Sequence, residues 1–269
     1  MAPFPWYLLT LPYFDLLLVG LSVLMGVLWL LHLRVKNASL ADAGFCLGLV
    51  WIIAVCGLMG EGHFWRRILV VGMGSVYAFR LGWHVMRNRV WRKVEDPRYE
   101  WLRSWLGQWE PVGFLGYFVL QIPGCVFFGA LLCWVMAHPQ EAVRGWDLLA
   151  ISIFLLAIAG ETVADRQLER FRADSENRGK VLREGLWRYS RHPNYFFEFL
   201  HWCAYVPLAV GLSWAGLAPV WPLLMLVFLL WITGVPLAEV QALKTRGKAY
   251  RAYQRTTNRL FPWMPRRNS

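Results

Sequence analysis

Apolar runs of about 20 residues recur along the whole chain, and they constrain its fold more than any other feature. An α-helix of that length, rising about 1.5 Å per residue, spans the hydrocarbon core of a bilayer. Of the 269 residues, 57% are hydrophobic and only 17% are charged. We therefore predict an all-α integral membrane protein, and we expect no cleavable signal peptide, because the first run lacks a basic flank before it.

Seven such runs are predicted to cross the membrane as helices. Their approximate bounds are 13–33, 40–59, 68–86, 112–136, 146–164, 193–212 and 217–238. The segments after the first, third, fifth and seventh runs hold two, six, eight and eight Lys and Arg, which is 24 of the 28 in the chain, against three in the opposite loops. The positive-inside rule then places the amino terminus outside and the carboxyl terminus in the cytoplasm.

The rest of the composition predicts one membrane domain over residues 1–269, since there is no internal repeat, low-complexity tract or Gly/Ser linker. The five cysteines all lie in apolar runs without a C-x-x-C pair, so we interpret them as buried small hydrophobes that indicate neither a disulfide nor a metal site. The net charge of +11 is explained by the loops, not by binding to nucleic acid. We expect a bacterial inner membrane rather than endoplasmic reticulum, and the oligomeric state stays open.

The stretch 190–201 joins a basic loop to an apolar helix. Proline disfavours helix for the residue before it and suits the first helical turn, so the helix is expected to begin at Pro193. Asn194, Glu198 and His201 then share one face. The positive end of the helix dipole faces basic residues, which favours phosphate. A nicotinamide dinucleotide, with phosphates in the cytosol and its ring in the membrane, fits this change from a basic loop to an apolar helix. The chain nevertheless lacks a G-x-G-x-x-G fingerprint.

Two sets of membrane-embedded polar residues each allow two interpretations. Tyr77, Arg80, His84 and Asn88 recur at i, i+3, i+7 and i+11, so they form a stripe that lines a cavity, unless Arg80 snorkels and Tyr77 makes an ordinary interhelical hydrogen bond. Asp42 lies at the start of the second run, where it is either a helix cap or a desolvated acid that donates a hydrogen bond.

Two long cytoplasmic loops carry further candidates, and their length suggests a site. The first contains the sequence Glu95-Asp96-Pro97-Arg98-Tyr99, which combines hydrogen-bond acceptors with anion-binding donors; lipid contact alone is the alternative. The second follows a helix on which Glu161, Asp165 and Arg172 share a face. Carboxylates at a helix carboxyl end oppose the dipole, which indicates a ligand; a solvated ion pair is the alternative.

The carboxyl-terminal segment 244–267 is predicted to be a short amphipathic helix on the membrane surface. Tyr250 and Tyr253 are expected to face the same side of it. In that position the segment closes the cytoplasmic entrance.

Together these motifs resemble the steroid 5-alpha-reductase superfamily, and most closely its bacterial branch of uncharacterised, DUF1295-type membrane proteins. The resemblance covers residues 42–262 and is strongest at 95–99, 161–167, 185–198 and Gly234-x-Pro236-x-x-Glu239. It implies a seven-helix bundle that holds NADPH in a cytoplasm-facing pocket. The implied reaction is reduction of an activated carbon–carbon double bond, the alkene of an enone, in a hydrophobic steroid- or isoprenoid-like substrate.

The resemblance also implies residue roles. Tyr77 would hydrogen-bond the substrate carbonyl, and protonated Asp42 would polarise it alongside, so that both stabilise the enolate that hydride addition creates. The residues implied to contact the cofactor are Asn88, Arg98, Tyr99, Asp165, Arg172, Lys180, Tyr189, Arg191, His192, Asn194, Tyr195, Glu198 and Arg246. The chain departs from the bacterial branch at Phe197, where Gly is usual, which puts the helix packing or pocket shape there in question.

Two other functions remain open at this point. Membrane methyltransferases of the isoprenylcysteine type share the Arg-His-Pro-x-Tyr element but use S-adenosylmethionine; the 95–99 loop, Asp165 and Arg172 favour the reductase. A non-enzymatic lipid-binding or assembly protein that retains the fold is the third hypothesis.

Overall fold

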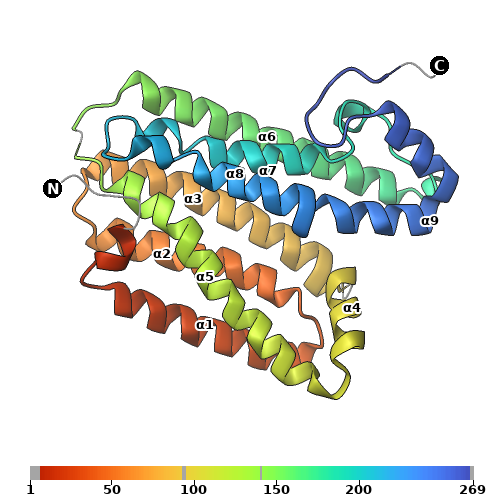
Figure 1. The fold of residues 1–269 in the computed structure, drawn as a ribbon, viewed down its shortest axis with the longest axis horizontal. Coiled ribbons are helices and arrows are strands. Elements are labelled where there is room, and N and C mark those ends of the chain that lie inside the picture. Colours follow the sequence, from red (N-terminus) through yellow and green to blue (C-terminus); the bar gives the residue numbers. More distant parts are fainter. Residues whose placement is uncertain (1–6, 93–94, 140, 267–269) are drawn as a thin grey trace. The chain divides into compact units, whose positions relative to one another are not determined.

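The computed structural model describes residues 7–92, 95–139 and 141–266, and over those ranges the chain forms helices and no strands (Figure 1). The all-helical prediction is therefore confirmed. The residues divide into two compact units. Unit 1 is Met1–Val143 with Ala209–Ala218, and unit 2 is Arg144–Leu208 with Pro219–Ser269. The single-domain organisation stays a prediction.

Unit 1 is built around α2, which packs against three other long helices. Its helices are α1 (Phe14–Val35), α2 (Leu40–Met59), α3 (Phe64–Val85), the short α4 (Pro97–Leu106) and α5 (Glu110–Met136). Small residues let the helices approach closely, as is common in membrane bundles. A Cβ at Gly48 of α2 would lie only 2.6 Å from Sγ of Cys125 in α5. The α2–α5 packing therefore requires glycine at this position.

Unit 2 consists of α6 (Gly145–Ala173), α7 (Pro193–Cys203), α8 (Val220–Val227) and α9 (Val235–Thr256). α6 packs along α7, and α7 packs along α8. A π-helical segment, η8 (Phe228–Ile232), follows α8, and α9 is kinked at Gly247, whose φ of 47° lies in the left-handed region. Glycine adopts such a φ without steric cost, so the kink is encoded locally.

Phe197, the departure from the expected glycine, has an explanation in unit 2. Its side chain is buried, and its ring lies against Gly160 of α6, where a Cβ would collide with it. A small residue on α6 thus accommodates the large residue on α7. Because the large Phe197 faces the small Gly160, α6 and α7 can still pack closely.

Six helical stretches of the described residues are long and apolar enough to cross a membrane, which supports a multi-pass membrane protein. They are Phe14–Val35, Leu40–Met59, Phe64–Trp91, Arg98–Met136, Gly145–Ala173 and Ala215–Thr256. The predicted span 193–212 is not confirmed, because α7 ends at Cys203 after 11 residues. A helix of that length rises about 17 Å, little more than half of a bilayer core. Pro207, which lacks an amide donor, and Gly211, with φ of 96°, interrupt the run.

The cysteine prediction was wrong for one pair. Cys56, near the end of α2, is joined by a disulfide to Cys133, near the end of α5, across 77 residues of sequence. Cys46 and Cys125 are buried free thiols, as expected, and Cys203 is partly buried. Burial alone does not reveal which cysteines meet, because the pairing depends on how α2 and α5 pack.

We expect loss of this disulfide, in the variant Cys56→Ser/Cys133→Ser, to lower the free energy of unfolding by about 2–4 kcal/mol, because the cross-link restricts the unfolded chain. Alkylation of the denatured protein gives a direct count. Without reductant three thiols should react, and with reductant all five. Five reactive thiols without reductant would contradict the bond.

Candidate functional site

The loop predicted to bind cofactor, residues 95–99, is held within unit 1 at the end where α2 begins. Glu95 accepts a hydrogen bond from the backbone amide of Ala38 at 2.5 Å and pairs with Arg103 at 2.8 Å. Arg103 also pairs with Glu110 at the start of α5. The loop therefore ties the α1–α2 turn to α4 and α5.

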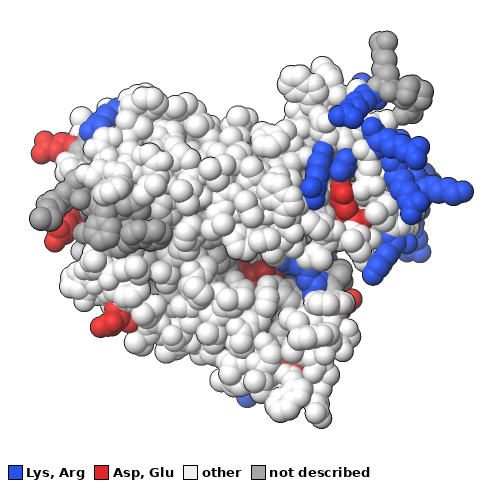
Figure 2. Space-filling view, viewed as in Figure 1, with Lys and Arg blue, Asp and Glu red and all other residues white. Residues whose placement is uncertain are grey.

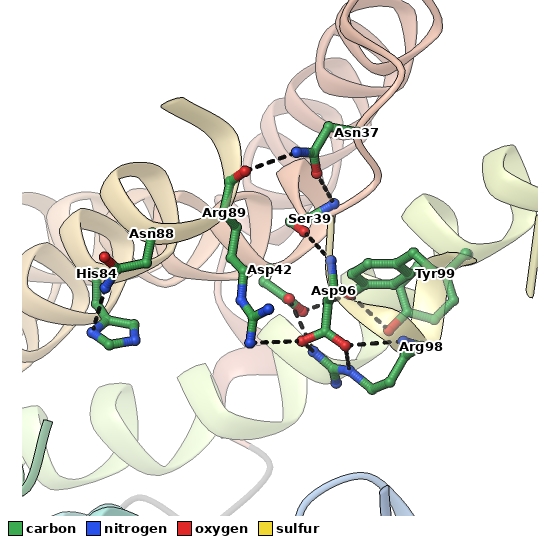
Figure 3. A network of polar contacts seen from close by, with 10 residues as sticks. Asn37, Ser39, Asp42, His84, Asn88, Arg89, Asp96, Arg98 and Tyr99 are labelled. Atoms are coloured by element: carbon green, nitrogen blue, oxygen red, sulfur yellow. Dashed lines mark hydrogen bonds and ion pairs between the residues drawn. The ribbon is translucent and has the colours of Figure 1, made fainter. Parts of the chain in front are cut away.

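Asp42 lies at the centre of the polar network at this end of unit 1 (Figure 3). Its carboxylate accepts a hydrogen bond from the Tyr99 hydroxyl at 2.7 Å and pairs with the Arg98 guanidinium at 3.1 Å. Two predicted cofactor residues, Arg98 and Tyr99, thus contact the predicted catalytic acid. Both side chains come from the segment 95–99, so this loop fixes the position of the Asp42 carboxyl.

Asp96 joins the loop to the network through charge. It caps the amino terminus of α4 by accepting from the Arg98 amide, and its carboxylate contacts Arg98 Nε at 3.0 Å and Arg89 at 3.3 Å. Burial acts to raise the pKa of Asp96, but the Arg98 and Arg89 guanidinium groups outweigh it and hold that pKa below its ordinary value. Asp96 is therefore ionised at neutral pH.

The depressed pKa of Asp96 predicts an acid-sensitive contribution to stability. Its stabilisation is fully present above the unfolded pKa of about 3.9 and is lost as pH falls through the lower folded pKa. Asp96→Asn keeps a good helix cap and removes only the charge, so we expect it to cost about 1.5 kcal/mol at neutral pH. Melting temperatures of both proteins should converge below about pH 4. A gap that is constant with pH would contradict the ion pair.

Members of the polar stripe predicted on the third helix lie on α3 and on the segment that follows it. Tyr77, 2% exposed, is on α3, and Asn88 lies on the π-helical segment η2 (Met86–Trp91) that extends it. His84 Nδ1 and Asn88 Nδ2 are 3.3 Å apart. π-helical turns inside helices are frequently found at functional sites. These polar residues therefore remain candidates for lining a binding site.

In unit 2, α7 begins at Pro193, and the residue before it, His192, is its N-cap, as predicted. Asn194 Nδ2 donates to Asp165 Oδ1 of α6 at 3.3 Å, so two predicted cofactor residues meet. Asn194 Oδ1 is buried and has no hydrogen-bond partner among the described residues. Lower on the same helix face, buried Glu198 accepts from Trp202 Nε1 at 3.1 Å.

The side chains of Arg191 and His192 bind other residues of unit 2. The Arg191 guanidinium donates to Glu239 at 2.7 Å and to the carbonyl oxygens of Gln254 and Thr257 at 3.1 and 2.7 Å. Burial lowers the pKa of His192, although the hydrogen bond to Glu239 opposes this effect. His192 Nε2 lies 3.3 Å from Glu239, and Gln254 donates to the other carboxylate oxygen at 2.9 Å. We call these four side chains, Arg191, His192, Glu239 and Gln254, the Glu239 clasp.

Further bonds fasten the same loop to the carboxyl-terminal segment. Ser190 Oγ donates to the Leu260 carbonyl at 2.6 Å, and the Tyr253 hydroxyl donates to the Ser190 carbonyl at 3.1 Å. The Trp263 amide donates to the Tyr189 carbonyl at 3.0 Å. The loop before α7 and the segment after α9 therefore form one hydrogen-bonded layer.

The other predicted cofactor residues differ in exposure. Arg172 and Lys180 are exposed, and Tyr189 and Arg246 are partly exposed. Tyr195 stacks on the His192 ring with centroids 5.5 Å apart. Glu239, at the centre of the clasp, was not among the predicted site residues. The Gly234-x-Pro236-x-x-Glu239 motif was the signal that could have identified it.

Comparison with known proteins places the chain in a family. The model of a family described as "Protein of unknown function (DUF1295)" matches residues 28–257. The "Uncharacterized protein C594.04c" of Schizosaccharomyces pombe (strain 972) is 26% identical over 223 residues, an alignment that covers 69% of this chain and 61% of the yeast protein. The alignment thus spans less than two thirds of that relative. Because the family match covers most of the sequence, this chain belongs to the DUF1295 family of proteins of unknown function.

Proposed function

We propose that this chain is an NADPH-dependent membrane reductase of the steroid 5-alpha-reductase type. It would reduce the activated carbon–carbon double bond of a hydrophobic, steroid- or isoprenoid-like enone. The observation that carries the proposal is the buried, unpartnered Asn194 Oδ1 beside Asp165 at the start of α7.

A buried amide oxygen without a hydrogen bond is costly, and native proteins leave few such atoms. Asn194 Oδ1 can accept a hydrogen bond, and Asp165 is an acceptor of charge −1 when ionised. Because Asn194 Oδ1 and Asp165 are hydrogen-bond acceptors, they suit a ligand with N–H or O–H donors. The carboxamide of nicotinamide and the ribose hydroxyls of NADPH are groups of that kind.

The phosphates of NADPH would be held by exposed cations. The first amides of α7 and the positive end of its dipole favour an anion, and Arg172, Lys180 and Arg188 are exposed in unit 2. Arg191 and His192 would act indirectly, because the Glu239 clasp fixes the loop from which α7 starts. The donor set of unit 2 is therefore compatible with a phosphorylated dinucleotide.

Bound NADPH would supply the hydride. In the proposed reaction, the hydroxyl of Tyr77 donates a hydrogen bond to the substrate carbonyl and stabilises the enolate oxygen as charge develops there. Protonated Asp42 assists this polarisation, and its contacts with Arg98 and Tyr99 fix its position.

The proposal retains seven membrane segments with the amino terminus outside and the carboxyl terminus in the cytoplasm. The disulfide supports this orientation, because Cys56 lies at the end of α2 opposite to Asp42 and the Arg-rich 95–103 segment. Disulfides persist in oxidising compartments, whereas Lys and Arg accumulate on the cytoplasmic side. A bacterial inner membrane, with its periplasmic side oxidising, meets both requirements.

Titration of the detergent-purified protein with NADPH tests the proposal. We expect saturable binding with a Kd in the micromolar range or below, and an enone-dependent oxidation of NADPH. Asn194→Ala should weaken binding about tenfold, because one hydrogen bond in a buried site is lost. Asn177→Ala, a partly buried asparagine elsewhere in unit 2, is the matched control and should bind normally.

Absence of binding to any nicotinamide nucleotide by the folded wild-type protein would overturn the proposal. Thermal stabilisation by S-adenosylmethionine without stabilisation by NADPH would instead identify a methyltransferase. Binding of neither ligand would leave the non-enzymatic hypothesis.

A further inference from the structure

The second half of α9 presents one basic face. After the kink at Gly247, Lys248, Arg251 and Arg255 are all exposed and recur at helical spacing along one side of the helix. We call these three residues the basic stripe. Figure 2 shows Lys and Arg gathered over the end of unit 2 where this part of α9 lies. After Glu239 the sequence contains eight Lys and Arg and no Asp or Glu.

The opposite face of the helix fixes the direction of the stripe. Tyr250 and Tyr253 lie on the same side, as predicted, and both are buried against Val181 and Leu243. Arg183 donates to the carbonyl of Ala249 at 2.8 Å. Because the apolar face is anchored to the body of unit 2, the basic stripe cannot turn inward.

Exposed apolar side chains follow the stripe. Trp263 is 73% exposed, and Phe261 and Met264 are also exposed, although the segment is well fixed. The Trp263 amide is bonded to Tyr189, and the Arg266 amide to the Thr256 carbonyl at 2.8 Å. Tryptophan is enriched at the membrane–water interface, where its ring lies among head groups. A fixed, exposed Trp beside a line of cations is typical of a surface that contacts lipid.

We propose that the basic stripe binds anionic phospholipid head groups of the cytoplasmic leaflet. The occupant is argued from charge and from position, since α9 continues from a membrane-spanning stretch and lies at the end of it. The stripe extends about 10 Å from Lys248 to Arg255, at about 1.5 Å per residue, which matches a plane of head groups better than one compact phosphate group. This inference does not depend on the proposed reductase activity.

The test is a nitroxide label on Ala252→Cys, an exposed position beside Arg251. The labelled protein is placed in nanodiscs of phosphatidylcholine alone or with about one third phosphatidylglycerol. Accessibility of the label to oxygen, relative to a water-soluble nickel complex, should rise only in the anionic nanodiscs, and 1 M salt should reverse it. The wild-type protein, treated with the same label, measures the signal that comes from its own cysteines. Glu176→Cys, at an exposed position of unit 2, is the control position.

Neutralising the stripe gives the decisive comparison. Each Lys or Arg near an anionic leaflet contributes about fivefold to the contact equilibrium. Lys248→Gln/Arg251→Gln/Arg255→Gln should therefore weaken contact about 100-fold and abolish the lipid-dependent signal. Arg178→Gln/Arg188→Gln, two other exposed arginines of unit 2, should retain it. A signal at Ala252 that is equal in both nanodiscs, or unchanged in the triple variant, would overturn the proposal.

Discussion

Arg191→Met is expected to lower the free energy of unfolding by about 3 kcal/mol, because it leaves the Glu239 carboxylate with too few partners. The Arg191 and Glu239 side chains are only 11% and 15% exposed, so water replaces the guanidinium poorly. Two backbone carbonyl bonds, to Gln254 and Thr257, are lost as well. Unfolding in mixed detergent micelles measures the change.

A double-mutant cycle separates the ion pair from the lost packing. Glu239→Gln alone removes the charge but can keep a hydrogen bond, and Arg191→Met/Glu239→Gln should be less destabilised than the two single changes predict together. Arg178→Met, at an exposed arginine, should change stability by no more than about 0.5 kcal/mol. Normal stability of Arg191→Met combined with weak NADPH binding would show instead that Arg191 serves the ligand directly.

The features that were predicted correctly from the sequence are those with local causes. Pro193 sets the start of α7 through its own ring and its clash with the preceding residue. The i, i+4 spacing of Asn194 and Glu198 follows from the helix alone. The predicted span 193–212 was too long, because it was drawn from hydropathy and Pro207 was not considered. Proline has no amide hydrogen to continue a helix.

The features that were missed depend on contacts between distant segments. Cys56 and Cys133 meet only because α2 and α5 pack closely. Arg191 was predicted to contact the cofactor, which stays a prediction, whereas its contact with Glu239, 48 residues away, was not predicted. The contacts of Asp42 with Arg98 and Tyr99, 56 and 57 residues further on, were not predicted, because they depend on where the 95–99 loop lies in the fold. A charged residue in a motif indicates that it has a partner without identifying that partner.

Tyr77→Phe is expected to lower kcat of the proposed reduction by about 10²–10³-fold, the usual effect of removing one donor from an oxyanion site. The hydroxyl of Tyr77 would bond an oxygen whose negative charge appears only as hydride reaches the alkene, so its loss should affect kcat much more than the Kd for NADPH. The ring is retained, and Tyr77 is 2% exposed, so the packing volume of α3 changes little.

Tyr13→Phe is the matched control, because Tyr13 is also a buried tyrosine but lines the small cavity beside Cys56 and Cys133, at the far end of α2 from Asp42. It should leave kcat within about twofold of the wild-type value, since that hydroxyl meets no developing charge. A Tyr77→Phe enzyme with normal kcat would exclude this hydroxyl as the carbonyl donor while leaving NADPH binding intact. A parallel loss in both variants would indicate a general effect of buried hydroxyls on folding, which their melting temperatures would reveal.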